Sequence, residues 1–243
     1  MGISKKAGTY IAAACFSFMM VAQPAGVMAA QKQQQSKPLK VVYYNQADYP
    51  GKKIGGSTIQ AAGCGPTSVA VCYSSLTGKK ADVPKMCKQA YEHGWYYTGQ
   101  GCTHNVIPGL SKLYGLSCKG LGYSKSAVEK ALNAGHPVVA LMGPGDFTKH
   151  GHFIVLTRMI GKDKVEVADV GSRANTAKTW SLSKVVSQGK EGATAGGPFW
   201  EISTKEETTT KQTPKEEVYK QEIQKSHSKI NAVQSAILKS IND

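Results

Sequence analysis

The segment Gly63-Cys64-Gly65-Pro66-Thr67-Ser68 decides how this sequence is interpreted. Pro66 is favoured in the first turn of a helix, the residues up to Leu76 can continue that helix, and Gly78 can end it. A cysteine at the mouth of a helix meets unpaired backbone N–H groups and the positive end of the helix dipole, which favour the thiolate. The segment is compatible with a nucleophilic Cys64 and equally with a buried structural or disulfide cysteine.

A nucleophilic cysteine needs a general base, and His152 is the best candidate. It opens the strongest strand pattern of the chain, Phe153–Ile160, directly after Gly151. The first position of a strand keeps the imidazole at the rim of a sheet, where a cleft can form. His150 is the main rival, whereas His93 (at a helix end), His136 (before a proline) and His227 (in a charged tail) fit structural or surface positions better.

Asp169 is the candidate for the group that orients the histidine. It is an acidic residue at the end of an otherwise apolar strand, and a buried carboxylate is costly unless it is paired. A two-residue turn at Gly161-Lys162 would place Asp169 opposite Ile154, on the face that His152 shares because side chains alternate along a strand. A three-residue loop without a bulge would place the carboxylate on the wrong face.

A side-chain amide upstream of the cysteine, beside the backbone N–H of Cys64, would complete an oxyanion hole. Gln46 and Gln60 are both candidates, and the residue pattern does not choose between them.

Helical patterns dominate the first half of the globular region and strand patterns the second half, which predicts an α+β fold with N-terminal helices packed on an antiparallel sheet. An initial strand is expected at 41–44. The further helices expected are 83–93, 104–114, 124–134 and 181–187, and the further strands are 137–142, 153–160, 164–170 and 199–202.

The two ends of the chain have compositions of their own. Residues 1–29 have the basic start, apolar run and small-residue cleavage pattern of a secretory signal peptide, with an uncleaved anchor as the alternative. Residues 30–39 form a polar leader, 40–203 the globular domain, 204–214 a polar linker and 215–243 a charged helical tail. The protein is therefore expected to be secreted or held at the cell surface, with no transmembrane domain after signal cleavage.

The charge and the cysteines restrict the partners. The formal net charge is +14, but only Arg158 and Arg173 among the 30 basic residues are arginine, which argues against specific nucleic-acid recognition and fits anionic cell-surface polymers. Neither a CxxC pair nor a Cys/His cluster with zinc spacing occurs, so no metal or cofactor is expected. Cleavage of the signal peptide would remove Cys15 and leave five cysteines, an odd number, so at least one thiol stays free. Besides Cys64, the remaining four allow three disulfide connectivities or full reduction: Cys72, Cys87, Cys102 and Cys118.

Four segments together resemble the C39-like peptidases, which are papain-fold cysteine peptidases related to the bacteriocin-leader peptidase domain. They are, in chain order, Tyr43-Tyr44-Asn45-Gln46, Gly63-Cys64-Gly65-Pro66-Thr67-Ser68, Gly151-His152-Phe153-Ile154-Val155-Leu156 and Val167-Ala168-Asp169. The resemblance spans residues 40–203. It departs from the family at Val170, where a proline often follows the aspartate.

The resemblance implies Cys64 as nucleophile, His152 as base, Asp169 as the orienting acid and Gln46 as the oxyanion donor, with a peptide or protein as substrate. The function expected is hydrolysis of peptide or amide bonds through a thioester. A catalytically inactive domain that binds at the cell surface and a cell-wall amidase are the alternatives.

Overall fold

The computed structural model of the chain describes residues 38–205. The expected signal peptide, the tail and most of the expected leader and linker lie outside these residues, so their interpretation stays a prediction. The last strand includes Thr204, which had been assigned to the linker. Between residues 38 and 205, no helix is both long and apolar enough to cross a bilayer.

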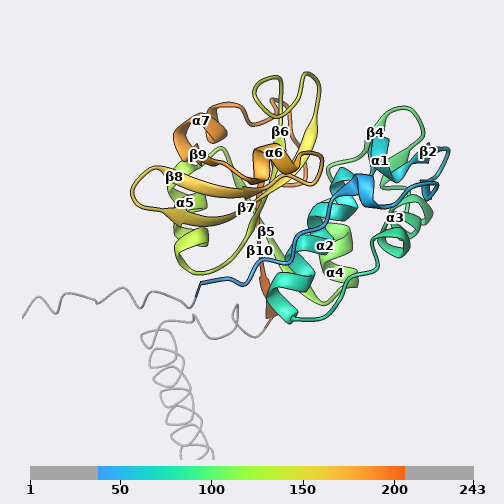
Figure 1. Cartoon of the computed structure of the whole chain (residues 1–243), viewed down its shortest axis with the longest axis horizontal. Coiled ribbons are helices and arrows are strands. Elements are labelled where there is room, and N and C mark those ends of the chain that lie inside the picture. The colour runs from blue at the N-terminus through green and yellow to red at the C-terminus, as the bar shows by residue number, and fades with distance from the viewer. Residues whose placement is uncertain (1–37, 206–243) are drawn as a thin grey trace, which may run out of the picture. The chain divides into compact units, whose positions relative to one another are not determined.

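The first half of the described chain is mostly helical. Two short hairpins, β1 (Lys53–Ile54) with β2 (Ser57–Thr58) and β3 (Tyr96–Tyr97) with β4 (Gly101–Cys102), project from it. The helices are η1 (Gln46–Asp48), α1 (Ile59–Ala62), α2 (Cys64–Thr77), α3 (Val83–Glu92) and α4 (Val106–Leu113). Figure 1 shows α2, α3 and α4 gathered beside the sheet that the second half builds.

The second half forms a six-stranded antiparallel sheet in the order β5-β10-β6-β7-β8-β9. Three helices, α5 (Lys125–Asn133), α6 (Arg173–Thr176) and α7 (Leu182–Ser187), accompany it. The strands are β5 (Leu116–Gly122), β6 (Val138–Met142), β7 (His152–Ile160), β8 (Lys164–Ala168), β9 (Thr179–Ser181) and β10 (Phe199–Thr204). The predicted α+β class, with helices packed on an antiparallel sheet, is confirmed.

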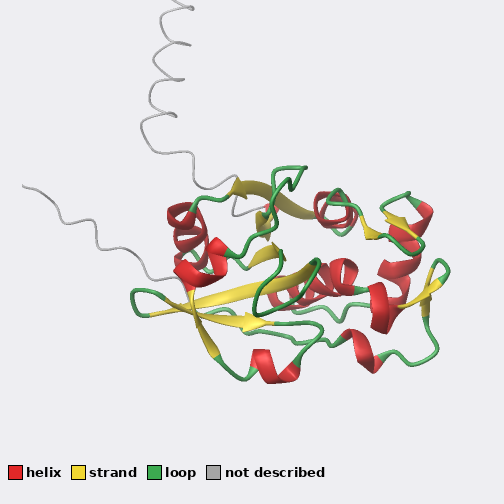
Figure 2. Cartoon of the chain, turned by 90° about the horizontal axis from the view of Figure 1, so that it is seen from above, coloured by secondary structure: helices red, strands yellow, loops and turns green. Residues whose placement is uncertain are grey.

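Both faces of the sheet are covered, and this explains the uninterrupted apolar run of β6. Val139 and Leu141 join the core under α2, whereas Val138, Ala140 and Met142 join a second core under α5 and α7. A strand buried on both faces needs apolar residues at every position, unlike a half-exposed strand, in which they alternate with polar ones. Figure 2 shows the helices, in red, flanking the strands, in yellow.

The hairpin between β7 and β8 differs from the prediction and yet reaches the predicted register. Ile160 pairs with Lys164, so the loop holds three residues instead of two. A β-bulge between Leu156 and Arg158 then adds one residue to β7 and compensates for the longer loop. Beyond the bulge Val155 pairs with Ala168, and the same register places the next residue, Asp169, opposite Ile154.

One predicted strand is absent, and one long strand of the sheet was not predicted. Residues 41–44 form no strand, because their backbone meets no strand partner: the N–H of Val42 donates to the hydroxyl of Ser75 on α2 at 2.9 Å. Conversely, β5 was not expected, since its two glycines and one lysine carry no alternating pattern. It becomes a strand by pairing with β10, which is distant in sequence.

Candidate active site

Cys64 is the first residue of α2, at the position that the sequence predicted for it. Its two glycine neighbours are required by close packing. A Cβ on Gly63 would lie 2.6 Å from the side chain of Ile59, and a Cβ on Gly65 would lie 2.9 Å from Val106. The Gly-Cys-Gly segment therefore allows the start of the helix to pack tightly against its neighbours while the cysteine side chain stays at the surface of a cleft.

The structure brings the three predicted residues Cys64, His152 and Asp169 into contact. Nε2 of His152 lies 2.7 Å from Oδ1 of Asp169. The imidazole also acts on the Cys64 thiol as a hydrogen-bonding group and by its charge, and because Nε2 is already engaged by the carboxylate, Nδ1 is the ring nitrogen available for this second partner. The side chains form one series, from a carboxylate through an imidazole to a thiol.

Asp169 is 1% exposed, and its carboxylate is fully supported by hydrogen bonds. Oδ1 accepts the backbone N–H of Gly171 at 2.9 Å in addition to the bond with His152, and Oδ2 accepts the amide of Asn175 at 2.8 Å. Asn175 lies on α6 and was not expected from the sequence. Its contribution depends on how a four-residue helix folds back over β8, which no local pattern indicates.

The charges of the three groups reinforce one another. Burial acts to raise the pKa of Cys64, but the hydrogen bond and charge of His152 and the N–H groups of Phe153 and Gly65 outweigh it and lower that pKa. Burial likewise disfavours the imidazolium, yet Asp169 and Cys64 raise the pKa of His152 to about 10. Burial opposes ionisation of Asp169 too, and the bonds from His152 and Asn175 still lower its pKa. These shifts favour a Cys64 thiolate beside a His152 imidazolium.

The two glutamines expected near the site have different surroundings. The side-chain amide of Gln46 donates to the backbone carbonyl of Gln60, and its backbone N–H donates to Val170 at 2.8 Å. Its carbonyl oxygen, Oε1, is buried without a hydrogen-bond partner in the described residues. The side chain of Gln60 is exposed, so of the two, Gln46 is held between the segment of Asp169 and the segment of Cys64.

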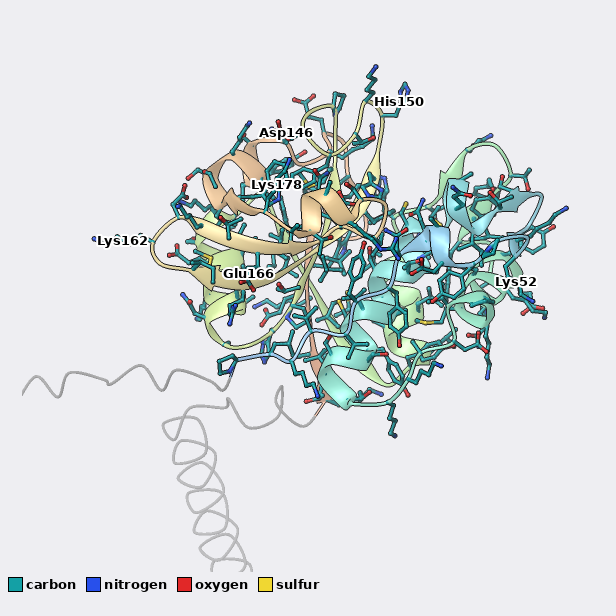
Figure 3. The ribbon with its side chains drawn as sticks, viewed as in Figure 1. Lys52, Asp146, His150, Lys162, Glu166 and Lys178 are labelled. Carbon is teal, nitrogen blue, oxygen red and sulfur yellow. The ribbon has the colours of Figure 1, made fainter. Side chains whose placement is uncertain are left out.

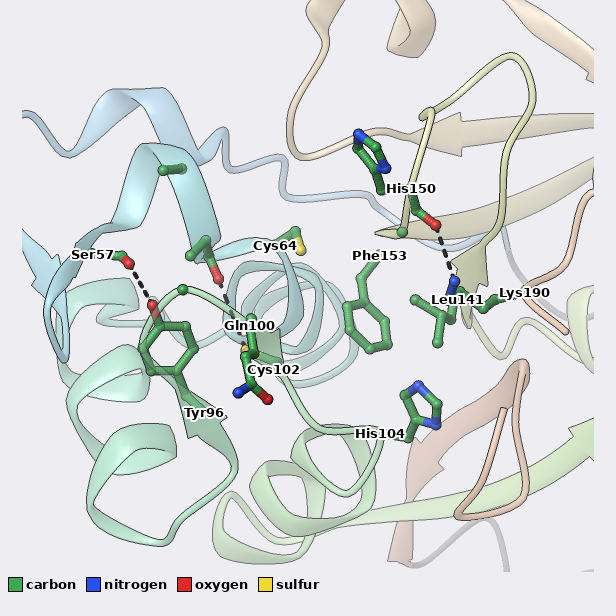
Figure 4. Close-up of a pocket in the computed structure, with 15 residues that line it drawn as sticks. Ser57, Cys64, Tyr96, Gln100, Cys102, His104, Leu141, His150, Phe153 and Lys190 are labelled. Carbon is green, nitrogen blue, oxygen red and sulfur yellow. Dashed lines mark hydrogen bonds between the residues drawn. The ribbon is translucent and has the colours of Figure 1, made fainter. Parts of the chain in front are cut away.

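A cleft of about 560 Å³ opens beside Cys64 (Figure 4). One wall comes from α1 and the β3–β4 hairpin and includes Tyr96 and Cys102. The opposite wall comes from the ends of β6 and β7 and from the loop that joins α7 to β10. It includes Leu141 and Phe153. Cys64 therefore has access to a space large enough for part of a peptide.

The other histidines do not replace His152. His150 is exposed on the loop between β6 and β7 (Figure 3), and His104 lines the cleft at its far side (Figure 4). His93 ends α3 and stacks on Trp95, whereas Nδ1 of His136 lies 2.6 Å from the Glu201 carboxylate. The structural interpretation of His93 and His136 agrees with these contacts.

The sequence left open whether the cysteines form disulfides or are all reduced, and in the structure they are all reduced. The five free thiols of the described residues are Cys64, Cys72, Cys87, Cys102 and Cys118. Burial raises the pKa of Cys72 and Cys87, which fits inert core thiols. In residues 38–205 no group of three or more His, Cys, Asp or Glu side chains is arranged to hold a metal ion.

The sequence matches the Peptidase_C39 like family over residues 38–196, and the chain belongs to this family. The α+β class expected from the sequence, with helices packed on an antiparallel sheet, is the arrangement that the structure shows. No curated protein sequence matches the chain. One solved structure that resembles it is the peptidase domain of Streptococcus ComA, described as a bifunctional ABC transporter involved in a quorum-sensing pathway. It shares 12% sequence identity at a TM-score of 0.46, over 60% of this chain and 93% of that one.

Proposed function

We propose that this protein is a cysteine peptidase that hydrolyses peptide or amide bonds through a thioester intermediate. The observation that carries the proposal is the series Asp169–His152–Cys64, in which Asp169 binds the imidazole, the imidazole lowers the pKa of Cys64, and Cys64 lines an open cleft. Membership of a peptidase family supports the same reaction class. The proposal includes export of the protein, which rests on the sequence of residues 1–29 alone.

In the proposed reaction, the Cys64 thiolate attacks the carbonyl carbon of the scissile bond and a tetrahedral oxyanion forms. The His152 imidazolium gives its proton to the leaving amine, the C–N bond breaks, and a thioester to Cys64 remains. The neutral His152 then takes a proton from water, whose oxygen attacks the thioester carbonyl; the C–S bond breaks, the acid leaves, and the Cys64 thiolate and the His152 imidazolium are restored. Asp169 holds the imidazole in place throughout.

Two donors are suited to the oxyanion. The N–H of Cys64 is at the open start of α2, and it makes no backbone hydrogen bond to residues 38–205 outside its own helix. The Gln46 amide uses one N–H on the Gln60 carbonyl and has a second N–H left. We propose Gln46 as the side-chain donor, and its immobilisation by Val170 and Gln60 would keep it preorganised.

The test is hydrolysis of a fluorogenic peptide library by the wild type and by Cys64→Ala. The variant is expected to lose turnover by about 10⁴-fold or more, since the nucleophile and its base act as a unit. Cys72→Ala is the matched control, because it removes a buried thiol from the same helix. Thermal melting of each variant reports whether the fold is retained. Turnover by a folded Cys64→Ala protein at the wild-type rate would reject the proposal and favour a binding domain.

A further inference from the structure

The walls of the cleft carry basic groups and no acidic ones. Fifteen residues line it, and Lys190, His104 and His150 are among them, whereas no aspartate or glutamate is. Some lysines elsewhere on the described surface pair with carboxylates, such as Lys125 with Asp163 and Lys184 with Asp146, whereas the residues that line the cleft offer Lys190 no such partner. The cleft therefore presents uncompensated positive charge to whatever enters it.

Lys190 is held firmly in the wall beside Gly151. Its backbone N–H donates to the carbonyl of Leu141 at 2.9 Å, and its carbonyl accepts the Tyr123 hydroxyl at 2.6 Å. Its side chain runs past Gly151, since a Cβ placed there would meet the Lys190 stem at 3.7 Å. The ammonium ends on the carbonyl of His150, at 3.1 Å. Figure 4 shows this bond on the wall opposite Tyr96.

The ammonium of Lys190 retains binding capacity. A lysine carries three N–H donors, and the contact with His150 uses one of them. Among the described residues no carboxylate lies within ion-pair distance of this group, although its side chain is only partly exposed. A half-buried cation whose one partner is a neutral carbonyl gains most from an anionic ligand.

His104 adds a donor of fixed tautomer to the same cleft. Its Nδ1 accepts the backbone N–H of Thr194 at 2.8 Å, which requires an unprotonated Nδ1 and places the proton on Nε2. Burial and the positive charge of Lys190 lower the pKa of His104, so the ring is neutral at pH 7. The residue thus offers an N–H to a ligand and adds no charge of its own.

We propose that Lys190 and His104 form a subsite for a carboxylate of the peptide substrate, so that the enzyme selects acidic substrates. This inference rests on the proposed peptidase function and adds the class of substrate. Lys190 supplies the charge and His104 supplies a neutral hydrogen bond. The carboxylate belongs either to an Asp or Glu side chain near the scissile bond or to the free C-terminus of the substrate, and the two sources are chemically equivalent at the subsite.

The test uses peptides that differ at one position, with Glu, Gln or Lys placed in turn at each site flanking the cleaved bond. Each peptide is made with a free and with an amidated C-terminus. A charge-assisted pair predicts that kcat/KM for the best Glu position exceeds that for Gln by about 10- to 100-fold, and less at high salt. Faster hydrolysis of peptides with a free C-terminus than of amidated ones, with Glu and Gln alike, would assign the carboxylate to the C-terminus, and a Glu preference retained on amidation would assign it to a side chain.

Variants of Lys190 locate the preference. Lys190→Met keeps the stem beside Gly151 and is expected to lower the Glu/Gln ratio to near one, and Lys190→Arg is expected to retain it. Lys190→Glu is expected to favour the Lys peptide. His104→Gln, which keeps a neutral N–H donor, is expected to retain more of the ratio than His104→Ala. Lys149→Met is the control, because Lys149 is an exposed lysine of the neighbouring loop outside the cleft.

The results separate the subsite from the peptidase function. The subsite is overturned, while Cys64-dependent hydrolysis of neutral peptides stands, if the wild type prefers neither Glu over Gln nor a free over an amidated C-terminus. It is also overturned if Lys190→Met leaves the preference unchanged. If no peptide is hydrolysed, the peptidase proposal fails, but binding measurements still test the subsite. Fluorescence anisotropy then gives the affinities for the Glu and Gln peptides of two proteins, Cys64→Ala and the double variant that also carries Lys190→Met. Equal affinities for the two peptides would reject it.

Discussion

Cys64 and Cys102 are two thiols in one cleft with opposite properties. Both line the cavity, and both receive a hydrogen bond from the backbone N–H of Gly65. Nevertheless the pKa of Cys64 is lowered and that of Cys102 is raised well above its ordinary value. Because the donor at the helix start is common to both, it does not account for the difference.

The difference comes from what else each thiol touches. Burial, together with the negative charge that the neighbouring Cys64 would carry, raises the pKa of Cys102. The Cys102 thiol donates to the backbone carbonyl of Ala62 at 3.9 Å. Cys64 is also desolvated, but it contacts His152, whose charge Asp169 supports. The comparison indicates that an ion-pair partner, more than the start of a helix, makes one of these thiols reactive.

His152→Ala is expected to have the largest effect on the difference in pKa and reactivity between Cys64 and Cys102. Without the imidazolium, burial should raise the pKa of Cys64 towards that of Cys102, and no group remains to protonate the leaving amine. We expect kcat/KM to fall by about 10⁴-fold. The rate of peptide hydrolysis and the pH dependence of Cys64 alkylation measure the two consequences separately.

His150→Ala is the matched control for this variant. His150 lies two residues away, is exposed and has no contact with Asp169 among its hydrogen bonds, so its removal should change kcat/KM by no more than a few fold. A loss in His150→Ala as large as that in His152→Ala would contradict the assignment of the base.

The next effect is a difference in the alkylation rates of the two thiols. At pH 6 a thiol of ordinary pKa is roughly 0.3% thiolate; the lowered pKa of Cys64 gives it a larger thiolate fraction, and the raised pKa of Cys102 gives it a smaller one. Iodoacetamide is therefore expected to modify Cys64 about 100-fold faster than Cys102, as measured by peptide mapping over a time course. Equal rates at pH 6 in the folded wild type would show that the two environments do not differ as described.

Local signals were enough to predict the helix of Cys64 and the strand of His152. Pro66 and Gly78 mark the ends of α2, and Gly78 does adopt a left-handed conformation there, with φ of 70°. The pairing of His152 with Asp169 was also predicted, but from a two-residue turn that does not exist. A bulge restored the register, and the buried pairing of the carboxylate gives a physical reason why this register is the stable one.

Features that depend on distant segments were not predicted from the sequence. Asn175 reaches Asp169 only because α6 folds over the end of β8, and Cys102 and Tyr96 face Cys64 only because the β3–β4 hairpin closes one side of the cleft. The strand β5 likewise depends on β10 as its partner. Such placements result from tertiary packing, which composition and periodicity do not encode locally.

The sign of the pH dependence follows from the raised pKa of His152. An imidazole of ordinary pKa, about 6.5, loses its proton near neutrality, whereas this one keeps it up to about 10 in the folded protein. The stabilising contribution of the imidazolium is therefore complete below about pH 6.5 and is lost as the pH rises through about 10. Peptide hydrolysis that requires the imidazolium should likewise decrease as the pH rises through about 10.

Asp169→Asn should give a smaller loss than His152→Ala and should also move the alkaline limit. The asparagine keeps an oxygen for His152 but removes the charge, and its own amide would oppose the amide of Asn175. We expect kcat to fall on the order of 10- to 100-fold and the pKa of His152 to decrease, so that the alkaline limb of the kcat/KM profile moves to lower pH.

Asn175→Ala, which leaves the carboxylate in place, should shift the alkaline limb in the same direction with only a few-fold loss of kcat. If Asp169→Asn leaves the alkaline limb where it is in the wild type, then the carboxylate does not set the charge of His152, and the contrast between Cys64 and Cys102 must have another cause.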